Sequence, residues 1–333
     1  MLYMKKVVLG LSDGVDSAVA GYILKAQGYE VTGVYLDIAG NEAREAAIAS
    51  ARELQIPLKI ADVTRELTEH VCKPFIAAYL RGETPNPCPG CNANVKLPLL
   101  LREEADCIAT GHYVRTDGTH LFMGSADNDQ SYMLSRLTGA QAARLLLPLG
   151  DKNKAQVRKI ALKKGFSCAA RPDSRENCFV KGLKYSEWIE QNCPEQVPPP
   201  GDVTFENEVI GRHGGIHTLT VGQKWGEMDG RRLYVSKINP LTNGVEVCVW
   251  EALFKTELRL TDLHFIYGAA PAQRFEGQIR VRHTRRETPR CTIIIEGAGA
   301  RVLTQSPVRA PAPGQPAALY IGDMLIGGGT VSP

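Results

Sequence analysis

Three cysteines lie in polar loops where their thiols could do chemistry. Cys88 and Cys91 are separated by two residues in the proline-rich segment 84–92, and Cys178 lies in a second polar loop. Taken alone, a single CxxC pair could be a redox couple, half a zinc site or half an iron–sulfur site. We expect Asn92 to cap the next helix, which would place Cys91 near a positive helix end and lower its thiol pKa.

A second segment with chemical potential follows the first β-like run. It consists of Gly10, Leu11, Ser12, Asp13, Gly14, Val15, Asp16 and Ser17, and it opens a helical pattern. Glycines permit a tight turn, and backbone N–H groups at a helix start attract phosphate. No lysine follows the glycines, so this is not the GxxxxGK[ST] loop. We interpret the segment as an anion cradle, with an ordinary strand-to-helix turn as the alternative.

Regular elements must hold these segments, and the first third of the chain alternates β-like and helical runs. The β-like runs are 6–9, 31–36 and 58–60, and the helical runs are 17–27 and 42–54. This order predicts an α/β fold with a parallel sheet and helices on both faces. Beyond it we expect helices at 65–81, 95–104 and 154–164, irregular structure at 82–91, a strand at 107–110 and a hairpin turning at Asp117 and Gly118.

The chain changes character after the proline run at 198–200. Short β-type segments follow at 203–210, 216–220, 233–238, 245–249, 278–283 and 291–296. We therefore expect an α/β domain over 1–200, a small central β-rich domain over 201–264 and a C-terminal β-barrel over 265–333. Residues 274–309 hold eight Arg and no Lys against three Glu, which suits bidentate phosphate contacts or a solvated β surface.

Composition excludes several protein classes. The chain has 333 residues, of which 44% are hydrophobic, so neither a small disulfide scaffold nor a disordered chain fits. The net charge of +3 does not by itself indicate nucleic-acid binding. No run of 18 apolar residues and no signal peptide is found, so we expect a cytoplasmic protein with no membrane partner. We expect the other six cysteines to be buried structural thiols: Cys72, Cys107, Cys168, Cys193, Cys248 and Cys291.

Short motifs occur in a fixed order along almost the whole chain. They lie at 84–92 (TPNP, ending in Cys91 and Asn92), 109–113, 129–132, 156–158, 173–179, 217–223 and 313–315. Residues 12–17 match the sequence SGGVDS except that Asp13 replaces the first glycine. In these motifs and their order the chain resembles the tRNA-specific 2-thiouridylases of the ATP pyrophosphatase (PP-loop) superfamily.

The resemblance implies a reaction and its residues. The wobble uridine of tRNA is adenylated on its 2-oxo group by ATP with Mg²⁺, and sulfur then displaces AMP. Cys91 matches the nucleophile, and Cys178 matches the cysteine that receives persulfide sulfur from a relay protein. Residues 10–17 with Leu36 and Gly111 match the ATP pocket, and Asp16 would help to hold Mg²⁺. The matches to tRNA-contacting positions are Asn86, Pro87, Cys88, His112, Asn128, Asp129, Gln130, Arg285, Arg286 and Gln315.

Two positions depart from the family pattern. Cys88 stands where the family has Asp, so three thiols could meet and hold a [4Fe–4S] cluster with one open iron. Cluster-dependent sulfur transfer therefore competes with the persulfide route, and structural zinc is a third alternative. The family's Arg-Tyr-Arg run appears as His283, Thr284, Arg285 and Arg286, which keeps charge but lacks the aromatic ring. For His112, a hydrogen-bonded core histidine is the alternative to a tRNA contact.

Two other classes of function remain open from the sequence. One is a different adenylating PP-loop enzyme, such as an amidotransferase or ligase that uses no RNA. The other is a non-catalytic tRNA-binding protein, which the replacement of a loop glycine by Asp13 motivates. Measuring the release of AMP and pyrophosphate in the presence of tRNA separates these classes. Release without sulfur transfer would favour the other adenylating enzyme, and no release would favour the binding protein.

Overall fold

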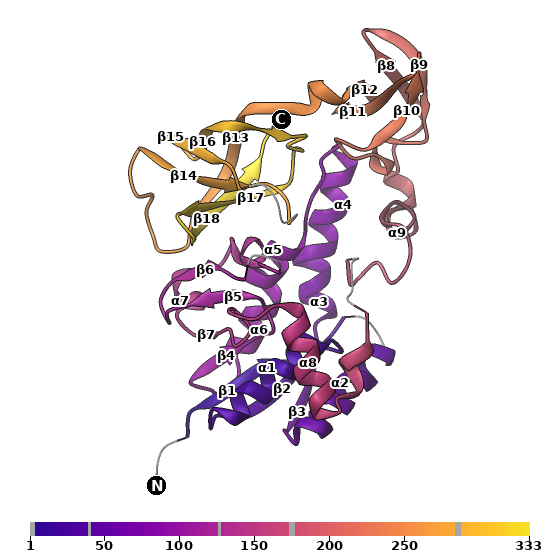
Figure 1. Ribbon diagram of the computed structural model, residues 1–333. Coiled ribbons are helices and arrows are strands. Elements are labelled where there is room, and N and C mark those ends of the chain that lie inside the picture. Colours follow the sequence, from indigo (N-terminus) through magenta and orange to yellow (C-terminus); the bar gives the residue numbers. More distant parts are fainter. Residues whose placement is uncertain (1–3, 39–40, 126–127, 173–176, 284–287) are drawn as a thin grey trace.

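A computed structural model describes the chain except for residues 1–3, 39–40, 126–127, 173–176 and 284–287. The first part contains a five-stranded parallel sheet in the order β3-β2-β1-β4-β7 (Figure 1). Its strands are β1 Lys6–Gly10, β2 Glu30–Asp37, β3 Leu58–Asp62, β4 Cys107–Ala109 and β7 Leu145–Leu146. The predicted α/β fold with alternating strands and helices is confirmed.

Both faces of this sheet are covered because its strands are apolar on both sides. Successive side chains of a strand point to opposite faces, so Val7 and Leu9 enter one core and Val8 enters another. The helices that pack on the first face are α1 Val15–Ala26, α2 Asn41–Leu54 and α8 Lys154–Lys164. Leu97 and Leu100 of a further helical segment pack on the second face.

Two helical segments cross this domain, and each contains a π-turn. The first consists of α3 Thr64–Leu67, the π-turn Thr68–Cys72 and α4 Lys73–Leu80. The second consists of α5 Cys88–Cys91, the π-turn Asn92–Lys96 and α6 Leu97–Leu101. The expected helix start at residue 95 and the expected irregular structure through 91 are therefore wrong, because Pro89 lies in the first turn, where proline is tolerated.

Shorter elements complete the helical content of the described chain. They are α7 Gly139–Ala142, α9 Tyr185–Asn192 and the 3-10 turns Ser131–Leu134, Ser167–Ala170, Pro194–Gln196, Ile216–Thr218 and Trp250–Leu253. Within the described residues, no helix combines the length and apolar character needed to cross a membrane.

A second sheet of five strands follows the proline run, in the order β10-β11-β12-β8-β9. Its strands are β8 Gly201–Phe205, β9 Glu208–His213, β10 Lys224–Met228, β11 Arg231–Asn239 and β12 Gly244–Val249. The segment expected as one strand at 203–210 is two strands, because Glu206 and Asn207 form a turn with φ of 51° and 69°. The strand expected at 216–220 is instead the 3-10 turn Ile216–Thr218.

The C-terminal part is a closed barrel of six strands. They are β13 Phe254–Phe265, β14 Arg274–Arg280, β15 Arg290–Glu296, β16 Gly299–Arg309, β17 Pro316–Ile321 and β18 Met324–Val331. Closure results because β13 pairs with both β16 and β18. The strand expected at 278–283 ends at Arg280, so Arg282 and His283 lie in the connection beyond it.

The barrel sheet continues into the first domain. The predicted hairpin forms from β5 Val114–Thr116 and β6 Leu121–Met123, and β6 pairs with β18 through Phe122 and Met324. A buried ion pair between Arg280 and Asp129 joins the same two parts. The barrel and the parallel-sheet domain are thus tied together by a shared sheet and a buried charge pair.

Candidate active site

The phosphate loop lies at the carboxyl end of β1 and leads into α1. The Ser12 N–H donates to Ser17 Oγ at 3.0 Å, and the Gly14 N–H donates to Ser12 Oγ at 3.1 Å. Ser17 Oγ in turn donates to the Gly14 carbonyl at 3.1 Å. These bonds tie the turn together, and the N-terminal end of α1 supplies the positive pole of a helix dipole.

Asp13 fits this turn without backbone strain. It is absent from the described non-glycine residues with positive φ, so the conformation does not require glycine. The Arg171 guanidinium donates through Nη1 to Asp13 Oδ2 at 3.1 Å and to the Asp13 carbonyl at 3.3 Å. The replacement of glycine therefore leaves the loop intact and adds an ion pair.

Asp16 is held from two directions. Lys154 Nζ donates to its two carboxylate oxygens at 2.9 and 2.8 Å, and the Tyr113 hydroxyl donates to Oδ1 at 2.5 Å. Lys154 is the first residue of α8, whose start is fixed by a capping box between Asn153 and Gln156. Since Lys154 lies far from Asp16 in the sequence, spacing alone did not identify it.

The other predicted ATP-pocket residues also meet at this edge of the sheet. A Cβ at Gly111 would lie 2.8 Å from the backbone of Asp16 and Ser17, so only glycine allows this close approach. Leu36 is half-buried near the end of β2, and the Leu11 N–H donates to the Val34 carbonyl at 3.0 Å. The loop, Leu36 and Gly111 therefore border one region at the carboxyl ends of β1, β2 and β4.

Four thiols gather beside this region. Cys91 is buried, Cys72 and Cys88 are half-buried, and Cys178 is exposed. The π-turn ending at Cys72 packs against α5, which carries Cys88 and Cys91. Cys178 is close enough to raise the pKa of the other three thiols by electrostatic repulsion. The expectation that Cys72 is a buried structural thiol is therefore wrong, because it is half-buried and belongs to this thiol group.

The expected low pKa of Cys91 is wrong. Burial raises the pKa of this thiol to about 11, because Lys96 only partly offsets the loss of solvation. The Asn92 side chain caps no helix start, since the helical segment begins at Cys88 and continues from α5 through the π-turn Asn92–Lys96. The Asn92 side chain instead donates to the Met133 carbonyl at 2.9 Å. The Cys91 thiol is consequently protonated near neutral pH.

Lys96 is a half-buried cation beside the thiol group. Burial opposes its charge, but Cys91, Cys178 and Cys88 together raise its pKa above the ordinary value. The Leu97 N–H donates to the Asn92 carbonyl across the π-turn, a five-residue spacing that replaces the usual four. Because a π-turn brings residues five apart onto one face, it directs Lys96 toward the side of Cys91.

His112 lies between the thiol group and the barrel. Its Nδ1 is 2.8 Å from Thr110 Oγ1, and burial, with Lys96 and His283 adding repulsion, lowers its pKa to about 3. The ring is therefore neutral at physiological pH. Gln130 Oε1 accepts the Tyr113 N–H at 3.1 Å, and Asn128 donates its backbone N–H to Ser125.

Asp129 is engaged inside the protein. It accepts the Gly124 N–H at 2.7 Å, the Ser131 hydroxyl at 2.9 Å and the guanidinium of Arg280. Its side chain is 6% exposed and that of Arg280 is 9% exposed. Asp129 thus links the parallel-sheet domain to the barrel through its ion pair with Arg280.

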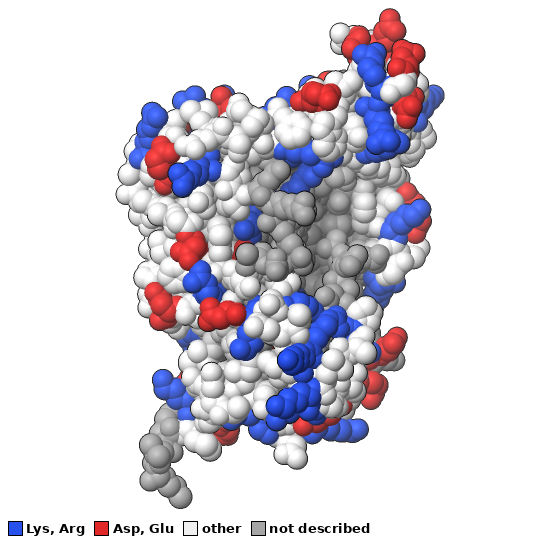
Figure 2. All heavy atoms as spheres, viewed as in Figure 1, with Lys and Arg blue, Asp and Glu red and all other residues white. Residues whose placement is uncertain are grey.

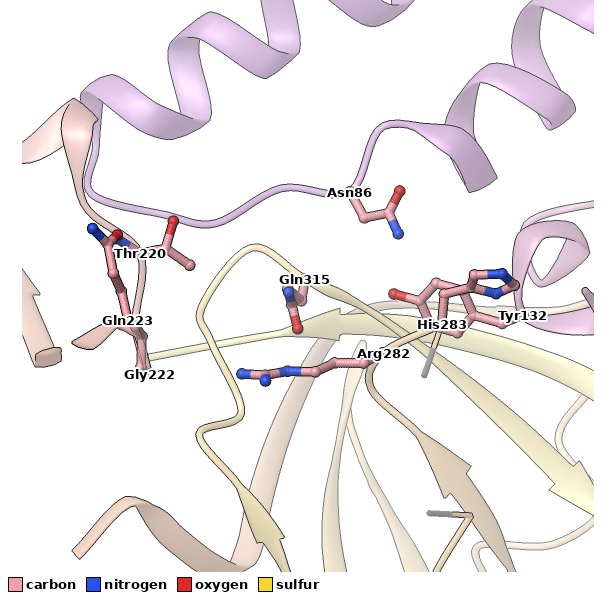
Figure 3. Close-up of a pocket in the computed structure, with 9 residues that line it drawn as sticks. Asn86, Tyr132, Thr220, Gly222, Gln223, Arg282, His283 and Gln315 are labelled. Atoms are coloured by element: carbon pink, nitrogen blue, oxygen red, sulfur yellow. The ribbon is translucent and has the colours of Figure 1, made fainter. Parts of the chain in front are cut away.

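A pocket of about 360 Å³ opens where all three parts of the chain meet (Figure 3). Figure 3 shows Asn86 and Tyr132 of the first domain facing Gln315, Arg282 and His283 of the barrel, with Thr220, Gly222 and Gln223 at one side. The structure therefore brings together Asn86 and Gln315, which are far apart in the sequence. Pro87, with Asn86 again, lines a second cavity of about 460 Å³.

Charge and metal-binding capacity complete the site. Figure 2 shows Lys and Arg side chains at several points of this face of the molecule. Arg285, Arg286, Asp173 and Ser174 lie outside the described residues. Among the residues that are described, no three His, Cys, Asp or Glu side chains are placed to hold a metal ion. The thiols as positioned do not form a cluster or zinc site.

Comparison with known proteins gives matches over the whole chain. Family models called tRNA methyl transferase HUP domain, tRNA methyl transferase PRC-barrel domain and Aminomethyltransferase beta-barrel domain match residues 5–182, 186–249 and 255–331. A tRNA-specific 2-thiouridylase MnmA of Clostridium botulinum strain Eklund 17B is 35% identical over 99% of this chain and 98% of the relative. The MnmA of Clostridioides difficile strain 630 is 32% identical over 99% of each chain.

The chain belongs to the tRNA-specific 2-thiouridylase family. It is therefore an enzyme of the sulfur-transferring class, as the motifs predict. A crystal structure of a 4-thiouridine synthetase–RNA complex with bound ATP is 19% identical over 58% of this chain and 51% of its own, with a TM-score of 0.35.

Several residues of this 2-thiouridylase site were not predicted from the sequence. They are Cys72, Lys96, Tyr113, Lys154, Arg171, Arg280 and Arg282. A signal existed for Tyr113, which ends the motif 109–113, and for Lys96, which follows the CxxC pair on the same helical run. The others join the site only through tertiary contacts.

Proposed function

We propose that this protein catalyses ATP-dependent 2-thiolation of the wobble uridine of tRNA. One observation carries the proposal: the thiols of α5, of the π-turn ending at Cys72 and of Cys178 gather beside the phosphate loop. Burial raises the pKa of Tyr35 on β2 to about 12, and Asp13 of the loop and Cys178 both contribute repulsion, so loop and thiol lie near the same side chain. A ligase that forms an amide requires no such thiols, which favours sulfur transfer.

The first step is adenylation of the uridine. The 2-oxo oxygen attacks the α-phosphorus of ATP, an O–P bond forms, and pyrophosphate leaves. The phosphate loop would bind the phosphate chain through its backbone N–H groups and the α1 dipole. Mg²⁺ bound with ATP supplies charge neutralisation, and the Asp16 carboxylate is the loop group suited to hold it.

The second step is sulfur transfer. A relay protein supplies a persulfide on Cys178, whose exposure suits docking of a partner. The terminal persulfide sulfur attacks C2 of the uridine, and the C–O bond to AMP breaks. The Cys91 thiolate then attacks the Cys178 sulfur, which releases the thiolated base and leaves a Cys91–Cys178 disulfide. A thiol reductant restores both cysteines, so no metal is required.

Burial of Cys91 fits this order of events. A thiol with a pKa of about 11 is a poor nucleophile near neutral pH, so it does not react before the persulfide has arrived. Lys96 favours the thiolate form and is positioned to stabilise it when the base is bound. The described thiol positions do not fit a cluster, and no step is assigned to one.

The tRNA would lie across the pocket at the junction of the three parts. Asn86 and Pro87 would border the target base, and Gln315 would contact the RNA from the barrel side. The other proposed contacts are Cys88, His112, Asn128, Gln130, Arg285 and Arg286. Asp129 would act through its neighbours, because its carboxylate is paired with Arg280 inside the protein. The expected domain limit at 264 falls inside β13, which closes the barrel, so we propose domain limits at 200 and 253. We also propose a cytoplasmic location in which tRNA is available.

Direct detection of the product tests the proposal. The full chain is incubated with ATP, Mg²⁺, unmodified tRNA and a cysteine desulfurase with cysteine as the persulfide source. We expect 2-thiouridine in the digested tRNA, with AMP and pyrophosphate released in matching amounts. Cys178→Ser should abolish thiolation, whereas Cys248→Ser, at a half-buried thiol on β12, should leave it unchanged.

Other outcomes identify the alternatives. Release of AMP and pyrophosphate without sulfur transfer would favour a different adenylating enzyme, and no release would favour a binding protein. Iron and acid-labile sulfide are measured on the same protein purified without oxygen. Near four of each per chain, lost on Cys88→Asp, would replace the persulfide route by a cluster.

A further inference from the structure

The phosphate loop contributes two carboxylates to ion pairs whose cations come from elsewhere. Asp13 pairs with Arg171 at 3.1 Å, and Asp16 pairs with Lys154 at 2.8 Å. Arg171 directly follows the 3-10 turn Ser167–Ala170, and Lys154 starts α8. These four groups sum to zero charge, although the loop has to bind a polyanion. Each of the two cations thus has a carboxylate of the loop as its partner.

The two pairs differ in how firmly they are held. Both Asp16 oxygens contact Lys154, and Tyr113 donates a further hydrogen bond, whereas Asp13 Oδ2 contacts one guanidinium nitrogen. The Asp13 side chain is also more exposed, at 43% compared with 27% for Asp16. Exposed ion pairs are weak because water solvates both partners. The Asp13–Arg171 pair is therefore the one that a ligand can exchange at low cost.

We propose that Asp13 is a built-in competitor for phosphate: it occupies Arg171 while the loop is empty, and a phosphate group of ATP takes its place. This rests on the proposed function, since it requires ATP on this loop. A guanidinium binds phosphate through two parallel hydrogen bonds, and a polyphosphate carries more charge than one carboxylate. The exchange therefore favours bound nucleotide without being irreversible.

The same exchange acts on the product. When pyrophosphate leaves, Asp13 can return to Arg171, so the cation does not have to remain unpaired. A glycine at this position, as in the SGGVDS pattern, has no side chain that could do this. Asp13 therefore weakens the binding of both ATP and pyrophosphate, and it acts through Arg171.

A double-mutant cycle tests the exchange. Dissociation constants for Mg·ATP and for pyrophosphate are measured by calorimetry on the full chain. Asp13→Asn, which removes the charge at nearly constant size, should tighten both by roughly two- to fivefold, the range for a partly exposed ion pair. Arg171→Met should weaken both, and adding Asp13→Asn to it should give no gain. As a matched control, Asp323→Asn removes a carboxylate paired with Arg115 at the hairpin–barrel contact and should change neither constant.

Each contrary result has a distinct meaning. Unchanged binding by Asp13→Asn would overturn the proposal, and an equal gain with and without Arg171 would show simple repulsion in place of competition. Weaker binding that appears only with Mg²⁺ would make Asp13 a metal ligand and would also overturn it. If the unaltered protein binds no ATP, the proposed function fails instead, and the two failures are thereby distinguished.

Discussion

The phosphate loop and the thiol group lie side by side but are prepared for their tasks in opposite ways. The loop is partly exposed, and its charges are already paired through Asp13 with Arg171 and Asp16 with Lys154. In the thiol group, Cys91 is buried and Cys72 and Cys88 are half-buried, and burial raises the pKa of these three thiols because their thiolates lose solvation. The charges of the phosphate loop are thus already paired, whereas the buried thiols are kept in the protonated, unreactive form.

This difference indicates how the order of two reactions can be built into one site. A preformed loop accepts ATP at once, because few groups have to move. A buried, protonated thiol reacts only after a change in its surroundings, such as desolvation of a bound base or the arrival of a persulfide. Adenylation can therefore precede sulfur transfer without a separate lid.

The largest expected effect is that of Cys91→Ser, which should abolish sulfur transfer at the thiol group and leave adenylation at the phosphate loop intact. Cys91→Ser should reduce 2-thiouridine formation below detection, because serine cannot attack the Cys178 sulfur to release the thiolated base. Pyrophosphate release with tRNA should continue, since the loop is untouched. Nucleoside mass spectrometry and a pyrophosphate assay on one sample measure both. Loss of both activities would mean that the halves are not independent.

The protonated state of Cys91 predicts a steep pH dependence of its alkylation. A pKa of about 11 in place of 9.0 reduces the thiolate fraction at pH 8 by about 100-fold, and the rate should rise about tenfold per pH unit up to pH 11. Iodoacetamide labelling followed by peptide mapping measures this, with the urea-unfolded chain as reference. Equal labelling of folded and unfolded chain would contradict the protected state.

The same shift predicts alkaline destabilisation. Because the folded-state pKa lies above the unfolded value, the stability it contributes is complete below pH 9 and is lost as pH rises through 11. Urea midpoints measured from pH 7 to 11 should therefore fall in the upper part of this range. Cys91→Ala should flatten that decline, and an unchanged slope would show that other groups cause it.

A glycine substitution should damage only the loop half. Gly111→Ala would place a methyl group 2.8 Å from the backbone of Asp16 and Ser17, so the loop must shift. We expect ATP affinity to fall by about tenfold or more, as for other displaced binding groups. Cys91 alkylation should stay the same. Gly90→Ala, where a Cβ meets nothing within 4 Å, is the matched control.

The smallest expected effect tests whether the charge of Lys96 controls the reactivity of Cys91. Lys96→Met removes the cation that lowers the pKa of Cys91, so its alkylation at pH 9 should slow by roughly three- to tenfold. Lys96→Arg keeps the charge and should recover most of the rate. If Lys96→Arg slows alkylation as much as Lys96→Met does and the pH profile is unchanged, Lys96 has a packing role alone.

The sequence predicts most of this architecture because its signals are local. The strand–helix alternation, the phosphate loop and the hairpin at Asp117 and Gly118 each follow from a few neighbouring residues. The error at Cys91 has the opposite origin. Its pKa depends on burial by elements distant in sequence, and the helix start moved because Pro89 is compatible with a first turn.

The partners of the loop show the same limit. Asp13 and Asp16 are visible in the motif, but Arg171 and Lys154 come from segments more than a hundred residues away. Asp129 belongs to a motif that resembles a tRNA contact, yet its carboxylate meets Arg280 of the barrel. Such pairings depend on how domains dock, which local spacing does not encode.

The strand pairing between β6 and β18 has a consequence for synthesis on the ribosome. Phe122 faces Met324, so the hairpin edge waits for a strand made about 200 residues later. At roughly 5–20 residues per second, this delay is on the order of 10–40 seconds. During that time β6 has an open edge, which is a common starting point for aggregation. The edge of β6 is therefore protected from wrong pairing only when β18 has been synthesised, however early the first domain becomes compact.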